Sequence, residues 1–142
     1  MAEYVMKHLV KQRGAEEGFL IDSAATSREE IGNGVHHGTR RKLAEMGVPC
    51  GNHRARQMTR EDYAHFDLLV GMDGANIRNM ERICGGDPER KIHKMLEFVG
   101  SGADVADPWY TGDFERAYND ILEGATNFLN YLVKKQDFFD KK

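Results

Sequence analysis

The chain has 142 residues and a mass of 16.1 kDa, a size at which one domain with an ordinary hydrophobic core is expected. Hydrophobic residues make up 40% and charged residues 30% of the sequence, and 20 basic against 23 acidic side chains give a net charge of −3. This composition excludes a disordered tail, a collagen-like chain and a membrane protein, and it lacks the basic excess typical of nucleic-acid binding.

The amino-terminal residues and the cysteines indicate a cellular compartment. Residues 1–8 mix charged with apolar side chains and so do not resemble a signal peptide. Cys50 and Cys84 are too few for a disulfide scaffold and lack the CxxC spacing of a zinc site. We therefore expect a cytoplasmic single domain over residues 1–142, with free thiols and with neither a membrane nor a nucleic-acid partner.

The first predicted element is a helix over residues 2–13. Its apolar side chains recur four residues apart, as Val5 and Leu9 do, and Gly14 suits the position that ends a helix. The apolar run Phe19–Ile21 is followed by small polar residues, a pattern typical of a short buried strand.

The middle of the chain continues with helices and strands in alternation. A helix is predicted over residues 38–46, since a glycine and a proline follow it. Thr59 and Asp62 resemble a capping box that opens a short helix through Phe66. The run Asp67–Met72 reads as a buried strand.

The second half of the chain completes the alternation. Asp73 is placed to cap a helix that ends near Cys84, and Ile92–Phe98 is a further strand candidate. A last helix is predicted from Asp113, and we expect one α/β domain with a parallel sheet. The apolar stripe of this last helix consists of Phe114, Tyr118, Ile121, Leu122, Ala125, Phe128, Leu129, Leu132 and Val133.

Several short motifs follow one another along the sequence, and their common order carries more weight than any one of them. Together they resemble the low molecular weight protein-tyrosine phosphatases, and the resemblance extends from Met1 to about Leu132. The motifs are Ser23-Ala-Ala-Thr-Ser27, Glu30-Ile-Gly-Asn33, Gly47-Val-Pro49, His53-x-Ala-Arg-Gln57, Asp67 to Asn76, Val105-Ala-Asp-Pro-Trp-Tyr110 and Asp113-Phe-Glu-x-x-Tyr118.

The resemblance implies a doubly wound parallel sheet of flavodoxin-like order. In this family a Cys-x5-Arg-Ser loop between the first strand and the first helix holds the phosphate, where backbone N–H groups and the helix amino terminus stabilise a thiolate and a phosphate dianion. The match begins just past that segment, so the first central strand, the nucleophile and the phosphate-binding arginine are absent from the 142 residues.

This departure generates three expectations for the 142-residue chain. The sheet should lack its first central strand and should be rearranged or domain-swapped, in a homo-oligomer or swapped dimer. The amphipathic last helix and its Phe138-Phe139 tail are the segment expected to take part. The chain should be inactive as a phosphatase. Either its start has been assigned at an internal methionine codon, which we favour, or it is a pseudophosphatase that has lost its nucleophile.

The resemblance also assigns roles to particular residues. Asp107, in Asp107-Pro-Trp, matches the general acid that protonates the leaving tyrosyl oxygen, and Trp109 and Tyr110 match the aromatic wall beside the substrate ring. Without the resemblance these residues would be a loop turn and an exposed aromatic pair.

Three further residues match family positions that support the phosphate loop: Ser23, His53 and Asp73. The alternatives are an ordinary loop serine, a surface histidine and a helix N-cap, and the last can be true together with the support role. His36 and His37 are adjacent without further ligands, which favours solvated loop residues over a metal site.

Two other Cys-x5-Arg stretches occur in the chain, Cys50 to Arg56 and Cys84 to Arg90. The first does not follow a strand, and the second leads from a helix into a strand, so no helix amino terminus would face an anion. We expect neither cysteine to be a nucleophile.

The sequence therefore predicts hydrolysis of phosphotyrosine in proteins or of small aryl phosphates, through a phosphocysteine intermediate, without metal or cofactor. One alternative is a non-catalytic binding module. Another is arsenate reduction, which needs more redox cysteines than this chain offers.

Overall fold

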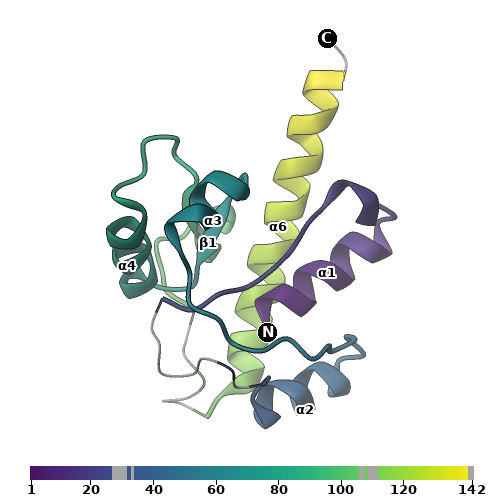
Figure 1. Ribbon diagram of the computed structural model, residues 1–142. Helices are drawn as coiled ribbons and strands as arrows, with labels where there is room; N and C mark the ends of the chain where they lie inside the picture. Colours follow the sequence, from purple (N-terminus) through teal and green to yellow (C-terminus); the bar gives the residue numbers. More distant parts are fainter. Residues whose placement is uncertain (27–31, 33, 106–107, 109–111, 141–142) are drawn as a thin grey trace.

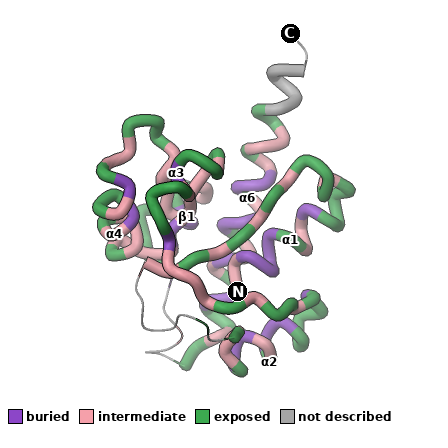
Figure 2. The backbone as a smooth tube through the Cα atoms, in the orientation of Figure 1, coloured by how far each residue is buried: buried purple, intermediate pink, exposed green. Residues whose placement is uncertain are grey.

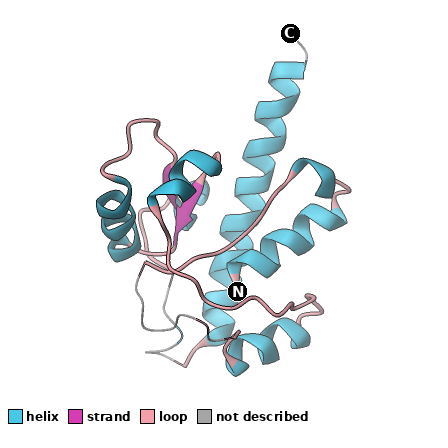
Figure 3. Ribbon diagram, in the orientation of Figure 1, coloured by secondary structure: helices cyan, strands magenta, loops and turns pink. Residues whose placement is uncertain are grey.

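The computed structural model describes residues 1–26, 32, 34–105, 108 and 112–140, the last five of these by their backbone alone. Helices dominate the described residues, and the strands are short (Figures 1 and 3). In chain order the elements are α1 (Ala2–Gln12), η1 (Glu16–Gly18), α2 (His37–Glu45), α3 (Arg60–His65), β1 (Leu69–Gly71), α4 (Gly74–Cys84), β2 (Ile92–Lys94), η2 (Met95–Val99) and α6 (Phe114–Asp140).

The sheet is a parallel pair. Leu69 of β1 lies opposite Ile92 of β2, and α4 connects the two strands and contacts both. A β-α-β unit of this kind requires a helical crossover, because parallel strands cannot be joined by a tight turn. The expected α/β class with a parallel sheet is confirmed, although the described residues form only two strands.

The strand predicted at Phe19–Ile21 is wrong. These residues belong to no strand, and Leu20 is 70% exposed. The backbone at Phe19 is extended, but an extended segment becomes a strand only where a neighbour completes the ladder. The nearest such pairing is a single parallel bridge between Ala25 and Gln57.

The strand predicted over Ile92–Phe98 ends early, at Lys94. The carboxylate of Glu97 accepts a hydrogen bond from the backbone N–H of Lys94 at 2.7 Å, which starts the 3-10 helix η2. Gly100, with a φ of +77°, then ends η2 in a left-handed conformation that glycine adopts without a Cβ penalty.

The predicted helices are confirmed to within one or two residues, apart from the far end of α6, for which no end was predicted. The boundaries follow local signals: Gly14 has a φ of +72° after α1, and Asp62 accepts from the backbone N–H of Thr59 at the start of α3. The N–H of Arg116 donates to Asp113 at the start of α6. Among the described residues, no helix combines the length and apolar character needed to span a bilayer.

The main core lies between α1, α6, α2 and η2, and Figure 2 shows the buried faces of α1 and α6. Leu43 and Val5 are its most deeply buried large side chains, and burying a residue of this kind stabilises the fold by roughly 1.5–3 kcal/mol. A second cluster, under α3 and α4, consists of Met58, Tyr63, Met80 and Cys84.

Gly124 determines how closely α6 approaches η2. A Cβ atom built on Gly124 would lie 2.6 Å from Cγ of Met95 and 2.9 Å from its backbone carbonyl oxygen. The two elements can pack at this distance only because position 124 has no side chain.

We predict that Gly124→Ala lowers the free energy of unfolding by about 1–3 kcal/mol, the usual cost of overpacking a core. Helix propensity alone predicts the opposite sign, a gain of about 1 kcal/mol. Urea unfolding measures the difference, and Asn119→Ala, at an exposed position of the same helix, is the control. A stabilised Gly124→Ala variant would contradict the packing.

Candidate functional site

A cavity of about 240 Å³ opens at the amino end of α1. Its walls come from four parts of the chain: the first turn of α1, residues 23–25, residues 34–39 around the start of α2, and residues 53–55. The first N–H groups of a helix have no partner within that helix, so this end of α1 carries a partial positive charge.

The carboxylate of Glu3 lies in this wall and is almost fully buried, with 4% of its side chain exposed. It accepts hydrogen bonds from Oγ of Ser23 at 2.5 Å and from Nζ of Lys7 at 2.7 Å. A buried charge is costly unless it is paired and hydrogen-bonded, and these two donors meet that requirement.

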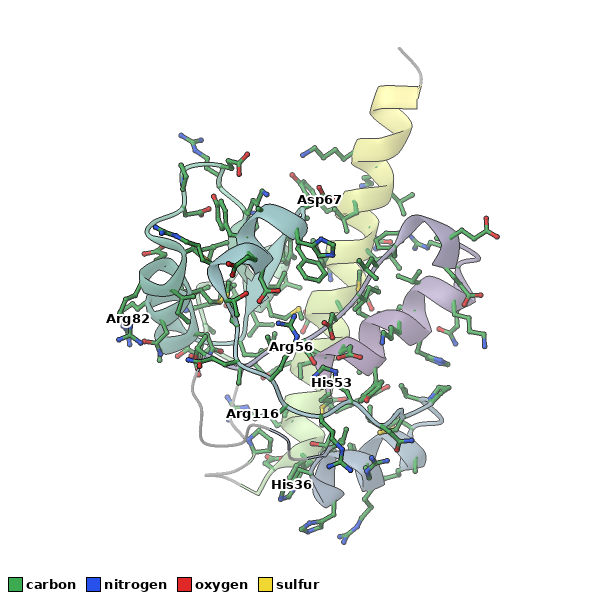
Figure 4. The ribbon with its side chains drawn as sticks, viewed as in Figure 1. His36, His53, Arg56, Asp67, Arg82 and Arg116 are labelled. Carbon is green, nitrogen blue, oxygen red and sulfur yellow. The ribbon has the colours of Figure 1, made fainter. Side chains whose placement is uncertain are left out.

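His53 lies beside Glu3, and Figure 4 shows His53 and Arg56 near the amino end of α1. Its Nδ1 is 3.3 Å from Oε1 of Glu3 and 3.4 Å from Oδ1 of Asp22. The backbone N–H of His53 donates to the hydroxyl of Tyr4 at 2.9 Å. Both the ring and the backbone of His53 are therefore held against α1.

Arg56 extends the charged network to α3. Its guanidinium contacts Oδ2 of Asp22 at 3.1 Å and both carboxylate oxygens of Asp62, at 3.0 and 3.2 Å. The hydrogen bond that Arg56 donates to Asp62 raises the pKa of Arg56, although partial burial lowers it. Burial by itself would raise the pKa of Asp62, but the hydrogen bonds from Arg56 and from the backbone of Thr59 outweigh it and hold that pKa below its ordinary value.

Two of the residues assigned to loop support meet at one atom. Ser23 and His53, thirty positions apart, both contact Oε1 of Glu3. Asp73 lies elsewhere: its carboxylate accepts from the N–H of Asn76 at 2.7 Å and caps α4, which confirms the N-cap interpretation. Its support role stays a prediction.

Asp107, Trp109 and Tyr110 lie outside the described residues, so their assigned roles remain predictions. Val105 is the last described residue before Asp107. The N–H of Val105 donates to the carbonyl of Met72, just past β1, at 2.8 Å.

Glu3, Asp22 and Arg56 were missed as site residues by the sequence analysis. A signal for Glu3 was present, because it falls on the buried face of α1 with Met6 and Val10, three and seven positions further along. A carboxylate at such a position needs a partner. For Asp22 and Arg56 no comparable signal exists, since their partners come from distant segments.

Glu3, Asp22 and His53 also form a possible metal-binding group, with ligand atoms within 4.8 Å of one another. Each of these carboxylates already accepts hydrogen bonds from a cation, Lys7 for Glu3 and Arg56 for Asp22. We therefore interpret the group as an ion-paired network. His36 lines the cavity, and its Nδ1 accepts from the N–H of Gly38 at the start of α2, so it has a capping role.

The two cysteines lie in unlike surroundings. Cys50 is half-buried, with Nη1 of Arg40 3.8 Å from its Sγ. Cys84 is buried in the last turn of α4, and burial, followed by the nearby Asp62 and Asp87, raises the pKa of its thiol. A thiol in such a setting is a poor source of thiolate.

Comparison with known proteins identifies the relatives of the chain. Residues 1–137 match the family described as low molecular weight phosphotyrosine protein phosphatase. The phosphatase YfkJ of Bacillus subtilis is 33% identical over 138 residues, covering 96% of this chain and 88% of YfkJ. The phosphotyrosine protein phosphatase of Homo sapiens is 33% identical, covering 91% of this chain and 84% of the human protein.

Solved structures agree with this relationship. The crystal structure of YfkJ superposes with a TM-score of 0.90 at 32% identity, over 94% of this chain and 86% of that one. The enzyme SP-PTP from Streptococcus pyogenes gives a TM-score of 0.82 at 34% identity, over 92% and 82% of the two chains.

We predict that Asp62→Asn lowers the free energy of unfolding by about 1–2 kcal/mol at pH 7, because a charge-assisted hydrogen bond to a partly exposed arginine is lost. The pKa of Asp62 is lowered in the folded state, so its contribution is complete above the ordinary value of 3.8 and disappears as the pH falls through the folded value. The gap between wild type and variant should therefore close below about pH 3.8.

Urea unfolding at pH 7, 5, 4 and 3 measures this gap. Glu61→Gln is the control, since Glu61 is exposed on the same turn of α3. A gap that is constant over this pH range would contradict the ion pair.

Proposed function

The chain belongs to the low molecular weight phosphotyrosine protein phosphatase family, and we propose that its cavity is the phosphate-loop side of a phosphotyrosine phosphatase site. The cavity at the amino end of α1, with Ser23 and His53 in its wall, carries the proposal. In the family the phosphate loop leads directly into the first helix, so the cavity lies where such a loop would end.

The proposed reaction proceeds through a phosphocysteine. A thiolate attacks phosphorus, the bond to the tyrosyl oxygen breaks, and Asp107 donates a proton to that oxygen. Asp107 then accepts a proton from the water that attacks the phosphocysteine, and inorganic phosphate leaves as the thiolate is regenerated. Trp109 and Tyr110 are proposed to flank the substrate ring.

Neither cysteine in the 142 residues suits the nucleophilic step. Cys50 is followed by a loop, and the arginine six positions later, Arg56, is occupied by Asp22 and Asp62. Cys84 lies at the carboxyl end of α4, where the helix dipole opposes an anion. We therefore propose that the 142-residue chain is inactive and that activity requires the family's strand and Cys-x5-Arg-Ser segment ahead of Met1.

The experiment is an aryl phosphate assay on two proteins: the 142-residue chain, and a chain extended at its amino end by a hydrophobic strand and Cys-x5-Arg-Ser-Pro. We expect vanadate-sensitive turnover from the extended chain alone, because a positioned general acid contributes only about 10²–10⁴ without a nucleophile. Vanadate-sensitive turnover by the 142-residue chain would refute its inactivity and would make Cys50 the nucleophile to test.

An inactive extended chain would favour the binding-module alternative, and arsenate-dependent thiol oxidation would favour the reductase.

The DNA sequence upstream of Met1 distinguishes an internal start codon from a pseudophosphatase. An in-frame Cys-x5-Arg-Ser-Pro supports an internal start, and an immediate stop codon supports a pseudophosphatase.

In the extended chain we predict that Asp107→Asn lowers kcat/KM, which reports the step in which the leaving group departs, by about 10²–10⁴ for phenyl phosphate, whose phenolate is a poor leaving group. The loss should be much smaller for p-nitrophenyl phosphate, whose leaving group departs with little protonation. Asp113→Asn is the matched control, because Asp113 caps α6 and is assigned no role in proton transfer. Equal losses of kcat/KM on both substrates would mean that Asp107 has a structural role.

We further propose that the 142-residue chain self-associates. Within the described residues β1 has one ladder partner, and the extended segment around Leu20 has none. Backbone N–H and C=O groups along such edges can pair with a strand of another chain. Light scattering should detect dimers or larger species at micromolar concentration. A compact monomer with a cooperative melting transition would contradict the proposal.

A further inference from the structure

The charged network does not end at the cavity wall. Beyond Glu3 and His53 it continues to Asp22, Arg56 and Asp62, which are not among the residues that line the cavity. We propose that Arg56 is a positioning residue for His53 and acts through the carboxylate of Asp22. The proposal rests on the proposed function of the cavity, since a fixed His53 matters there for supporting the phosphate loop.

Arg56 is itself fixed at both ends. Its guanidinium makes a two-point contact with Asp62, which also accepts from the backbone N–H of Thr59 at 2.8 Å. Its backbone carbonyl accepts from the N–H of Ala25 at 2.7 Å. Because a guanidinium is planar and its donors have fixed directions, a fork held in this way presents its remaining donors at a defined angle.

Asp22 receives those remaining donors. Its Oδ2 accepts from Nε of Arg56 at 3.3 Å and from Nη2 at 3.1 Å. Its Oδ1 accepts from the N–H of Ser23 at 2.8 Å and lies 3.4 Å from Nδ1 of His53. The two carboxylate oxygens of Asp22 thus have different partners, and the carboxylate cannot rotate without losing contacts at both oxygens.

The consequence for His53 concerns its ring. Two carboxylates, on Glu3 and Asp22, flank Nδ1, so this nitrogen carries a proton and donates it. In the neutral ring Nε2 is then the acceptor. Without Arg56 the side chain of Asp22, 35% exposed, is free to turn toward water, and His53 keeps only one of its two acceptors.

Arg54 provides a matched control. It lies two residues before Arg56 in the same segment and is exposed, and its guanidinium donates to the carbonyl of Gly32 at 2.9 Å, outside the network. Arg54→Gln and Arg56→Gln therefore remove the same charge and the same number of donors from one segment of chain.

The experiment is nitrogen-15 NMR of the histidine rings in the 142-residue protein over a pH series, with the tautomer read at pH values where the spectra show His53 neutral, because only the neutral ring has a tautomer. We expect His53 in wild type and in Arg54→Gln to show Nδ1 protonated. Arg56→Gln and Arg56→Lys should both move its ring signals toward a mixture of tautomers, because lysine restores charge but not the fork. The other five histidines are internal references.

A native His53 signal in both Arg56 variants would overturn the proposal. Loss of dispersion at all six histidines would mean that Arg56 only maintains the fold. If Arg56→Gln does not fold, Asp62→Asn is the substitute variant, because it weakens the contact that holds the guanidinium of Arg56 in place. The His53 ring signals are then compared between Asp62→Asn and wild type.

A kinetic arm uses the extended chain. Arg56→Gln should lower kcat roughly tenfold to a hundredfold, the range found when a partner that orients a functional group is removed, with a smaller change in KM. An equal kcat in Arg56→Gln and wild type would overturn the proposal. If wild-type extended chain does not turn over, the proposed function fails, and the ring spectra still decide whether Arg56 positions His53.

Discussion

The rest of the site depends on one buried carboxylate. Glu3 lies on the apolar face of α1, where an unpaired charge would cost several kcal/mol. Its partners come from α1 itself, from the extended segment after η1 and from the loop before α3, through Lys7, Ser23 and His53. Satisfying this single charge therefore brings three distant parts of the sequence to the amino end of α1.

The same network joins the two hydrophobic clusters. On one side Tyr4 belongs to the main core and binds the backbone of His53. On the other, Asp62 lies on α3 next to Tyr63, which belongs to the second cluster. Arg56 spans the distance between them. The cavity wall is thus held through contacts with both hydrophobic clusters, and contacts of this kind fix the position of the side chains in it.

Family membership and local geometry bear on different parts of the function. The match over residues 1–137 assigns the chain to the phosphotyrosine phosphatases. The geometry of the described residues concerns the surroundings of the cavity and of one thiol: a helix amino end, a supported serine and histidine, and a buried Cys84 whose setting disfavours a thiolate. The nucleophilic step is proposed to come from the family's own loop, which the 142 residues do not contain.

The helices could be predicted from sequence because their boundaries depend on local signals, and the family could be predicted because its motifs follow one another in order along the chain. Gly14 and Asp62 mark helix ends through their own backbone and neighbours, and Asp73 caps α4 through a residue three positions away. The strand at Phe19–Ile21 could not be decided in this way, since a strand exists only where a distant segment pairs with it. The sequence could not predict that Ser23 and His53 both contact Glu3, or that Arg56 contacts Asp22. Contacts between residues 20 to 50 positions apart form only when the chain has folded.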